Sequence, residues 1–147
     1  MENQRNDPPV HHRFFDRREG SAAIEFAIIA PLMVALLFGI LCYGMYFGVV
    51  HGVQQLAAEA ARAAISGISN AERKTLAQTA IANSAQSYPF LFDDKLVVTT
   101  LDTDPSTGTL TVSLQYDASG LPIFSLPYFP VPPSTITRSA SVQRGGF

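Results

Sequence analysis

The stretch FDRREGSAAIEFAIIAPLMVALLFGILCYGMYFGVV, Phe15 to Val50, decides how this chain is built. After a charged run that ends in Glu19 and Gly20, the 25 residues from Phe26 to Val50 carry no charge and are rich in aliphatic and aromatic side chains. About 20 apolar helical residues suffice to cross the hydrocarbon of a bilayer. The stretch therefore predicts a membrane-spanning helix with one carboxylate, Glu25, just inside its apolar part.

Two other structures compete for this apolar run. A helix buried in a protein core would need a large surrounding domain, and only about a hundred residues follow the run. A secretory signal peptide has an apolar region of about 7 to 15 residues followed by a small-residue cleavage site. The run in this chain is longer and leads into an alanine-rich segment, so we expect a single transmembrane pass.

The distribution of positive charge predicts the direction of this pass. Arg13, Arg17 and Arg18 precede the run closely, whereas the first cation after it is Arg62. Because positively charged residues flanking a span stay on the cytoplasmic side, the N-terminus is expected inside and the C-terminal part exported.

Two segments of the chain carry a specific pattern: REGSAAIEFAIIAP, from Arg18, and LAAEAARAAISG, which ends at Gly67. They resemble the TadE-like pseudopilins, which are minor pilins of the tight-adherence branch of type IV pili. In that family a prepilin peptidase cuts after a glycine, and a glutamate is the fifth residue of the mature chain. The resemblance implies a cut between Gly20 and Ser21, which makes Glu25 the fifth residue. Phe26 stands where the main pilins of this branch commonly carry tyrosine, which favours a minor subunit.

The resemblance also implies a function and its partners. We expect a minor pilin that takes part in pilus assembly, adhesion and biofilm formation, in contact with the prepilin peptidase, other pilins and pseudopilins, and the assembly platform of the pilus. The expected location is the bacterial cytoplasmic (inner) membrane. The expected parts are a cytoplasmic leader over 1–20, a transmembrane helix over 21–53, and an exported domain over 54–147 that includes a helix extension over 54–66.

The residues around the expected cut allow alternative interpretations. After cleavage, the Ser21 amine and the Glu25 carboxylate would lie one helical turn apart, so these two residues form a candidate assembly contact within or between subunits. Without cleavage, Gly20 would be a helix boundary with Ser21 as its cap. Glu25 would then be an anchor that reaches the interface.

Three glycines, Gly44, Gly48 and Gly52, follow one another at a spacing of four residues on one helix face. In lipid, small residues let helices approach closely, which predicts a helix-packing face. Glycine is also common in membrane helices in general, so the spacing has chance as an alternative explanation.

The remainder of the chain predicts an α+β fold. The segment Gln54–Ser66 should extend the first helix until Gly67 ends it, and SNAE at Ser69–Glu72 should cap a second helix over 71–86. Strands are expected over 95–101, 109–116 and 135–142, with DTDPSTG as the first turn. These three strands would form a small antiparallel sheet. The proline-rich segment 121–133 should be an irregular loop, packed on its own domain or on another subunit.

Several classes of function are excluded by composition and spacing. The net charge of −2 and the scattered cations offer no surface for nucleic acid. The histidines are His11, His12 and His51, none with a catalytic companion, so we expect no enzyme, small-molecule substrate, cofactor or metal. Asp102 and Asp104 are expected to be turn residues and not calcium ligands. The second functional hypothesis is an uncleaved, signal-anchored envelope adaptor or scaffold of a pilus or secretion apparatus.

Overall fold

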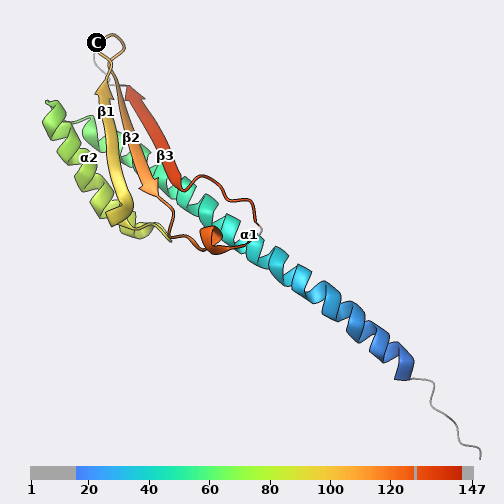
Figure 1. The fold of residues 1–147 in the computed structure, drawn as a ribbon. Coiled ribbons are helices and arrows are strands. Elements are labelled where there is room, and N and C mark those ends of the chain that lie inside the picture. The colour runs from blue at the N-terminus through green and yellow to red at the C-terminus, as the bar shows by residue number, and fades with distance from the viewer. Residues whose placement is uncertain (1–15, 128, 144–147) are drawn as a thin grey trace, which may run out of the picture. The chain divides into compact units, whose positions relative to one another are not determined.

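The structure is a computed structural model that describes residues 16–127 and 129–143. Two helices are followed by a three-stranded antiparallel sheet (Figure 1), so the predicted α+β fold is confirmed. The elements are α1 (Asp16–Ala64), α2 (Asn70–Ser84), β1 (Leu96–Thr103), β2 (Thr109–Asp117) and β3 (Thr135–Gln143), with 3-10 turns at Ala85–Ser87, Asp93–Lys95 and Pro122–Ser125.

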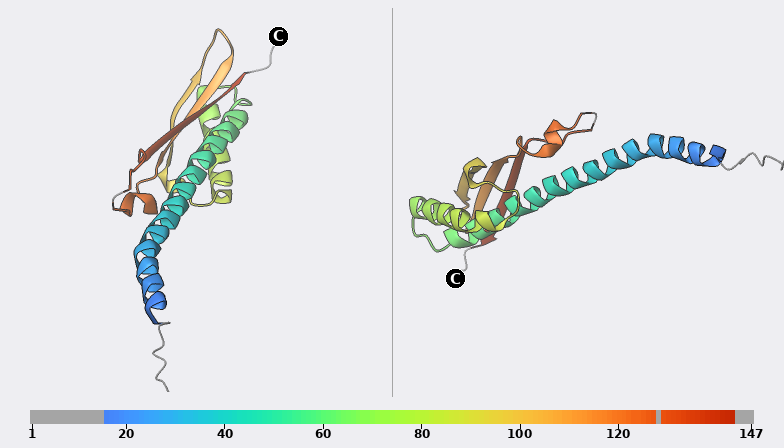
Figure 2. Two further views of the ribbon diagram at one scale, coloured as in Figure 1. Left: turned by 90° about the vertical axis from the view of Figure 1, so that its right-hand side faces the viewer. Right: turned by 90° about the horizontal axis from the view of Figure 1, so that it is seen from below.

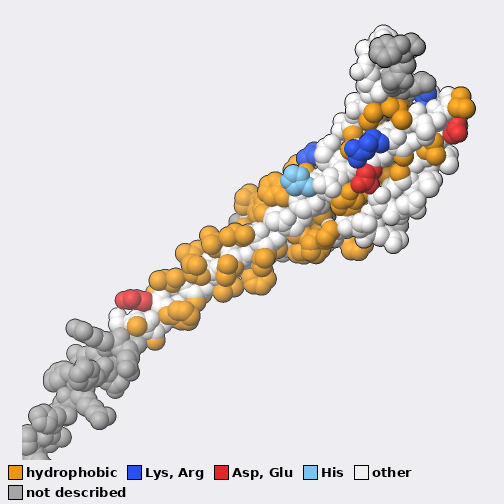
Figure 3. Space-filling view, turned by 180° about the vertical axis from the view of Figure 1, so that it is seen from behind, with side chains coloured by type: hydrophobic (Ala, Val, Ile, Leu, Met, Phe, Trp, Pro, Cys, Tyr) orange, Lys and Arg blue, Asp and Glu red, His pale blue; other side chains and the backbone are white. Residues whose placement is uncertain are grey.

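The chain divides into two compact units, residues 1–38 and 39–147, and α1 contributes to both. In the first unit, the large hydrophobic side chains from Ile24 to Phe38 have exposed fractions from 49% at Met33 to 72% at Phe26. The helix over Gly20–Ala64 is long and apolar enough to cross a membrane. Figure 3 shows how densely hydrophobic side chains cover α1 on the face in view.

In the second unit, the later part of α1 and α2 lie on the same face of the sheet (Figure 2). The strand order is β1-β2-β3, and β2 is the central strand. Its alternate residues Leu110, Val112, Leu114 and Tyr116 are buried, which is the period-two pattern of a strand with one covered face. A bulge at Thr99 interrupts the register between β1 and β2.

The turn between the two helices follows the predicted signals. The N–H of Gly67 donates to the carbonyl of Ala64 at 3.1 Å, so α1 ends two residues before the expected Ser66. Ser69 caps α2 by accepting from the N–H of Glu72 at 3.2 Å, and the Glu72 carboxylate accepts from the N–H of Ile68 at 2.9 Å. The predicted Ser69 cap is thereby confirmed, while the return bond of the box goes to the N–H of Ile68, one residue before the cap.

Arg73 stabilises this turn, a role that no local sequence pattern predicts. Only 5% of the residue is exposed, and its guanidinium donates to the carbonyl of Gly67 at 2.9 Å and to Thr103 Oγ1 at 3.1 Å. These bonds connect the helix turn to the end of β1. An added Cβ at Gly67 would lie 2.9 Å from the backbone nitrogen of Arg73, so this close approach requires glycine.

The hairpin between β1 and β2 has the predicted turn chemistry. Gly108 has a φ of 66°, and Asp104 Oδ1 accepts from Ser106 Oγ at 2.6 Å and from the Ser106 N–H at 2.8 Å. Thr107 Oγ1 donates to Asp104 Oδ2 at 3.0 Å. These bonds, those from Ser106 first, hold the pKa of Asp104 below its ordinary value. Asp104 is therefore engaged as a turn residue.

The loop 121–133 packs on α1 of its own chain. Ile123 is fully buried, and the hydroxyl of Tyr46 donates to the carbonyl of Pro133 at 3.1 Å. The hydroxyl of Tyr43 donates to the carbonyl of Pro130. Of the two interpretations of this loop, packing on its own domain is the one that these contacts support.

Candidate processing and assembly site

The four residues of the predicted processing site lie on the exposed part of α1. Gly20, Ser21, Glu25 and Phe26 are all exposed, and a Cβ placed on Gly20 would have no heavy atom within 4 Å. Ser21 and Glu25 face each other across one helical turn, since Ser21 Oγ lies 3.4 Å from Glu25 Oε1. The site therefore combines an open backbone position with a carboxylate next to the residue that would become the N-terminus.

The structure corrects the alternative in which Ser21 caps the helix. α1 begins at Asp16, so Gly20 and Ser21 already lie inside the helix. The Ser21 hydroxyl is directed to Glu25 and not to a free N–H at a helix end. Ser21 is thus not an N-cap of α1.

The position of Glu25 defines what the site can do chemically. In the intact chain, the neighbour of the carboxylate is a neutral hydroxyl group. Cleavage of the Gly20–Ser21 bond would release an α-ammonium group on the same residue, which is charged at neutral pH to the extent set by its ordinary pKa of about 7.7 to 8.0. An ion pair between this group and Glu25 is then possible across the same helical turn.

The three glycines of the predicted packing face have two different surroundings. A Cβ on Gly44 or Gly48 would meet no atom within 4 Å. A Cβ on Gly52 would lie 2.6 Å from Leu91 Cδ1 and 3.5 Å from Tyr88 Cβ. Gly52 therefore makes room for the chain's own α2–β1 connection, whereas Gly44 and Gly48 are open to another molecule.

An apolar groove of about 650 Å³ lies over these two open glycines. Gly44 and Gly48 are two of its lining residues, together with Met45 of α1 and with Pro89 and Phe90 of the α2–β1 connection. Phe90 is 52% exposed and has a φ of 65°, which is unusual for a residue with a side chain. Phe90 is not predictable from the sequence, because the only local signal is Pro89, which ends the preceding helical pattern.

Other predicted candidates have separate positions. His51 lies exposed on α1, while Arg13, His11 and His12 lie outside the described residues. Within residues 16–127 and 129–143, the His, Cys, Asp and Glu side chains form no group of three or more that could hold a metal ion.

Comparisons with known proteins identify a family segment in α1. Residues 20–62 match the family model described as TadE-like protein. The matched range includes Gly20, Ser21, Glu25, Phe26 and the three glycines. Neither the curated proteins nor the solved structures give a match. The resemblance predicted from the residues is confirmed by this family match.

Proposed function

From this TadE-like segment we propose that the chain is a minor pilin of a tight-adherence pilus system. The observation that carries the proposal is the coincidence of the matched range, 20–62, with the open glycine, the Ser21–Glu25 contact and the glycine groove. Such a subunit acts by assembly and not by catalysis, and contributes to pilus formation, adhesion and biofilm formation.

The proposed topology follows from the charge distribution and the helix. α1 anchors the chain in the inner membrane with the leader in the cytoplasm, because Arg17 and Arg18 precede the apolar run. The sheet and α2 are then on the exported side. The exposed side chains between Ile24 and Phe38 are in contact with lipid until the subunit joins other helices.

The proposed processing step is cleavage after Gly20 by a prepilin peptidase. Gly20 is exposed, and glycine weakens a helix by about 1 kcal/mol relative to alanine, so the backbone at this point is readily opened. Removal of 1–20 leaves Ser21 as the N-terminus.

The proposed assembly contact is the Glu25 carboxylate with a Ser21 ammonium. When helices bundle away from water, both charges would otherwise be unpaired in an apolar setting, which is strongly unfavourable. The 3.4 Å separation of Ser21 Oγ and Glu25 Oε1 makes pairing within one chain possible. Pairing with the amine of a neighbouring pilin would in addition set the axial register between subunits.

The second candidate function is an uncleaved, signal-anchored adaptor of the same apparatus. The span and the sheet domain suit both functions equally. They differ in the role of Glu25, which serves as an interfacial anchor in the adaptor and as an ion-pair partner in the cleaved pilin.

The experiment compares wild type with Glu25→Gln and Glu25→Asp in cells that contain the pilus system. Glutamine keeps the shape and polarity of the side chain but removes its charge. We expect Glu25→Gln protein to insert in the membrane but to be recovered with the other pilins at least tenfold less than wild type, with Glu25→Asp between them. Thr79→Ala, at an exposed position of α2 outside this stretch, serves as the control. Normal recovery of Glu25→Gln protein would contradict the assembly contact and favour the anchor role.

A further inference from the structure

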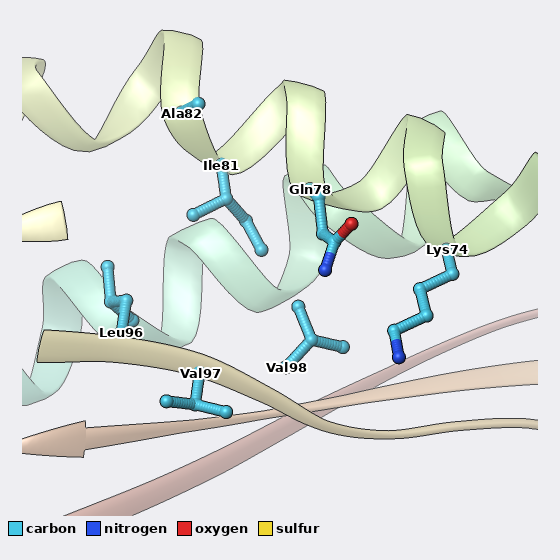
Figure 4. A pocket seen from close by; sticks show the side chains of 7 residues that line it. All are labelled: Lys74, Gln78, Ile81, Ala82, Leu96, Val97 and Val98. Carbon is cyan, nitrogen blue, oxygen red and sulfur yellow. The ribbon is translucent and has the colours of Figure 1, made fainter. Parts of the chain in front are cut away.

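A second groove lies far along the chain from the glycine groove, between α2 and the outer edge of β1. One hollow of about 440 Å³ is lined by Lys74, Gln78 and Ile81 of α2 and by Leu96, Val97 and Val98 of β1 (Figure 4). An adjoining hollow of about 340 Å³ shares Lys74 and Val98 and extends to Leu101. The two together form one continuous β1 groove that follows the strand from Leu96 to Leu101.

The strand that borders this groove has an unpaired edge. β1 is the first strand in the order β1-β2-β3, so in the described part of the chain only β2 pairs with it. The other edge strand, β3, differs because Gln54 of α1 donates to the carbonyl of Ser139 at 3.1 Å. An open strand edge offers N–H and C=O groups to another strand.

The dimensions of the groove suit an extended peptide. At about 3.3 Å per residue, the stretch from Leu96 to Leu101 spans roughly 20 Å. A peptide of about six residues in extended form covers this length. A helix beside a free strand edge also provides a side wall against which alternate side chains of the added strand can pack.

The side chains that line the groove indicate which side chains a bound peptide should have. Ile81 of α2 and Val98 of β1 point toward one another and give the groove an apolar floor (Figure 4). The ammonium group of Lys74 is exposed beside Val98. Among the described residues Lys74 has no ion-pair partner. An apolar side chain on the floor and a carboxylate beside Lys74 satisfy both features.

We propose that the β1 groove docks an extended, acid-bearing segment of a partner protein, which adds to the sheet as a strand beside β1. β3 of a second copy does not fit this groove, because β3 carries Arg138 and no carboxylate, and Arg138 would repel Lys74. β1 of a second copy does carry a carboxylate, Asp102, and the effect of chain concentration on peptide binding distinguishes it from a partner protein. The bulge at Thr99 limits unselective pairing along the edge. This docking depends neither on cleavage after Gly20 nor on the glycine groove.

The test uses the full chain in detergent micelles and three fluorescent peptides of about six residues. Valine alternates with threonine in each, and one threonine is replaced by glutamate, glutamine or lysine. We expect the glutamate peptide to bind, with about tenfold weaker binding of the lysine peptide and with glutamine between them, measured by fluorescence anisotropy. The bound glutamate peptide should slow hydrogen exchange of the amides between Leu96 and Leu101.

Two matched charge reversals complete the experiment. Lys74→Glu should weaken binding of the glutamate peptide about tenfold and restore binding of the lysine peptide, whereas Arg138→Glu on β3 should change neither. Both variants alter residues outside the core, so unchanged urea unfolding confirms that they fold. The proposal is overturned if no peptide binds at about 1 mM, if Lys74→Glu leaves the preference unchanged, or if protection falls on β3. Displacement of the peptide at rising chain concentration would assign the groove to a second copy and also overturn it.

Discussion

Two stretches of the same helix, α1, have opposite surfaces. Between Ile24 and Phe38 the large hydrophobic side chains are at least 49% exposed, whereas a second set further along the helix is fully buried: Val49, Val53, Leu56, Ala57, Ala60, Ala61 and Ala64. The buried residues repeat at intervals of three and four, as one face of an amphipathic helix does. The exposed stretch lacks such a cover within its own unit. The second stretch therefore serves the fold, while the first needs an apolar surrounding from outside the chain.

The largest difference between the two stretches is expected when leucine is replaced by alanine in each of them. Leu56 is fully buried, so Leu56→Ala should lower the free energy of unfolding of the sheet unit by about 2 to 5 kcal/mol. Leu36 is 52% exposed, and Leu36→Ala should leave that free energy within about 0.5 kcal/mol of wild type. Urea unfolding of the full chain in micelles, followed by tyrosine fluorescence, measures both. Equal losses would mean that Leu36 also belongs to the folded core.

Glycine substitutions should separate two roles of one helix face, which are packing within the chain and packing on partner helices. Gly52→Leu places atoms where Leu91 and Tyr88 already lie and should destabilise the sheet unit by about 1 to 3 kcal/mol. Gly48→Leu meets open space and should leave stability unchanged while reducing crosslinking to partner helices. Unfolding and crosslinking measured on both variants distinguish them. Undiminished crosslinking in Gly48→Leu would show that the open glycines are incidental to packing.

This division of the glycines shows where sequence patterns reach their limit. The spacing of Gly44, Gly48 and Gly52 is regular along the helix, but the surroundings of Gly52 depend on Tyr88 and Leu91, which are distant in the sequence. The same holds for Arg73, whose partner Thr103 lies 30 residues away. Local patterns contain no information about such long-range contacts.

Elements set by local chemistry were predicted well. The cap at Ser69, the turn at Gly108 and the alternation along β2 each depend on residues close together in the chain, and all three are present. β1 begins at Leu96, one residue after the predicted Lys95, because Asp93–Lys95 forms a 3-10 turn before the strand. Of the candidate site, the contact of Ser21 with Glu25 was predictable from helical spacing, whereas the wall formed by Phe90 was not.

The start of α2 is stabilised by a side-chain cap, Ser69, in contrast to the long apolar stretch of α1. Ser69→Ala removes the acceptor of the Glu72 N–H and should destabilise the sheet unit by about 1 kcal/mol. Thr79→Ala, within the exposed part of α2, replaces threonine by a better helix former and should have the opposite sign, by a few tenths of a kcal/mol. Both are measured by urea unfolding. A neutral Ser69→Ala would mean that packing of α2 alone fixes its start.

The smallest effect is expected at the exposed hairpin turn, in the pH dependence of stability. The pKa of Asp104 is lowered in the folded chain by hydrogen bonds from Ser106 and Thr107. A lowered pKa means that the unfolded chain binds protons first, so this contribution is present above the ordinary value of 3.8 and is lost as the pH falls through the lower folded value. Asp104→Asn should therefore reduce the fall in the free energy of unfolding as the pH drops below about 3.8. An unchanged acid slope would contradict the role of Asp104.

Our main proposal is that the exposed stretch of α1 becomes the N-terminal assembly helix of a processed pilin. The intact mass and the first residue of the chain recovered from membranes test this claim. Because residues 1–20 are rich in heavy side chains, their removal from the 15.9 kDa chain should lower the mass by roughly 2.5 kDa and leave Ser21 first. A bulky residue in Gly20→Ile should block this loss, as should deletion of the prepilin peptidase. Wild-type chain that still begins at Met1 in cells with an intact pilus system would contradict the claim.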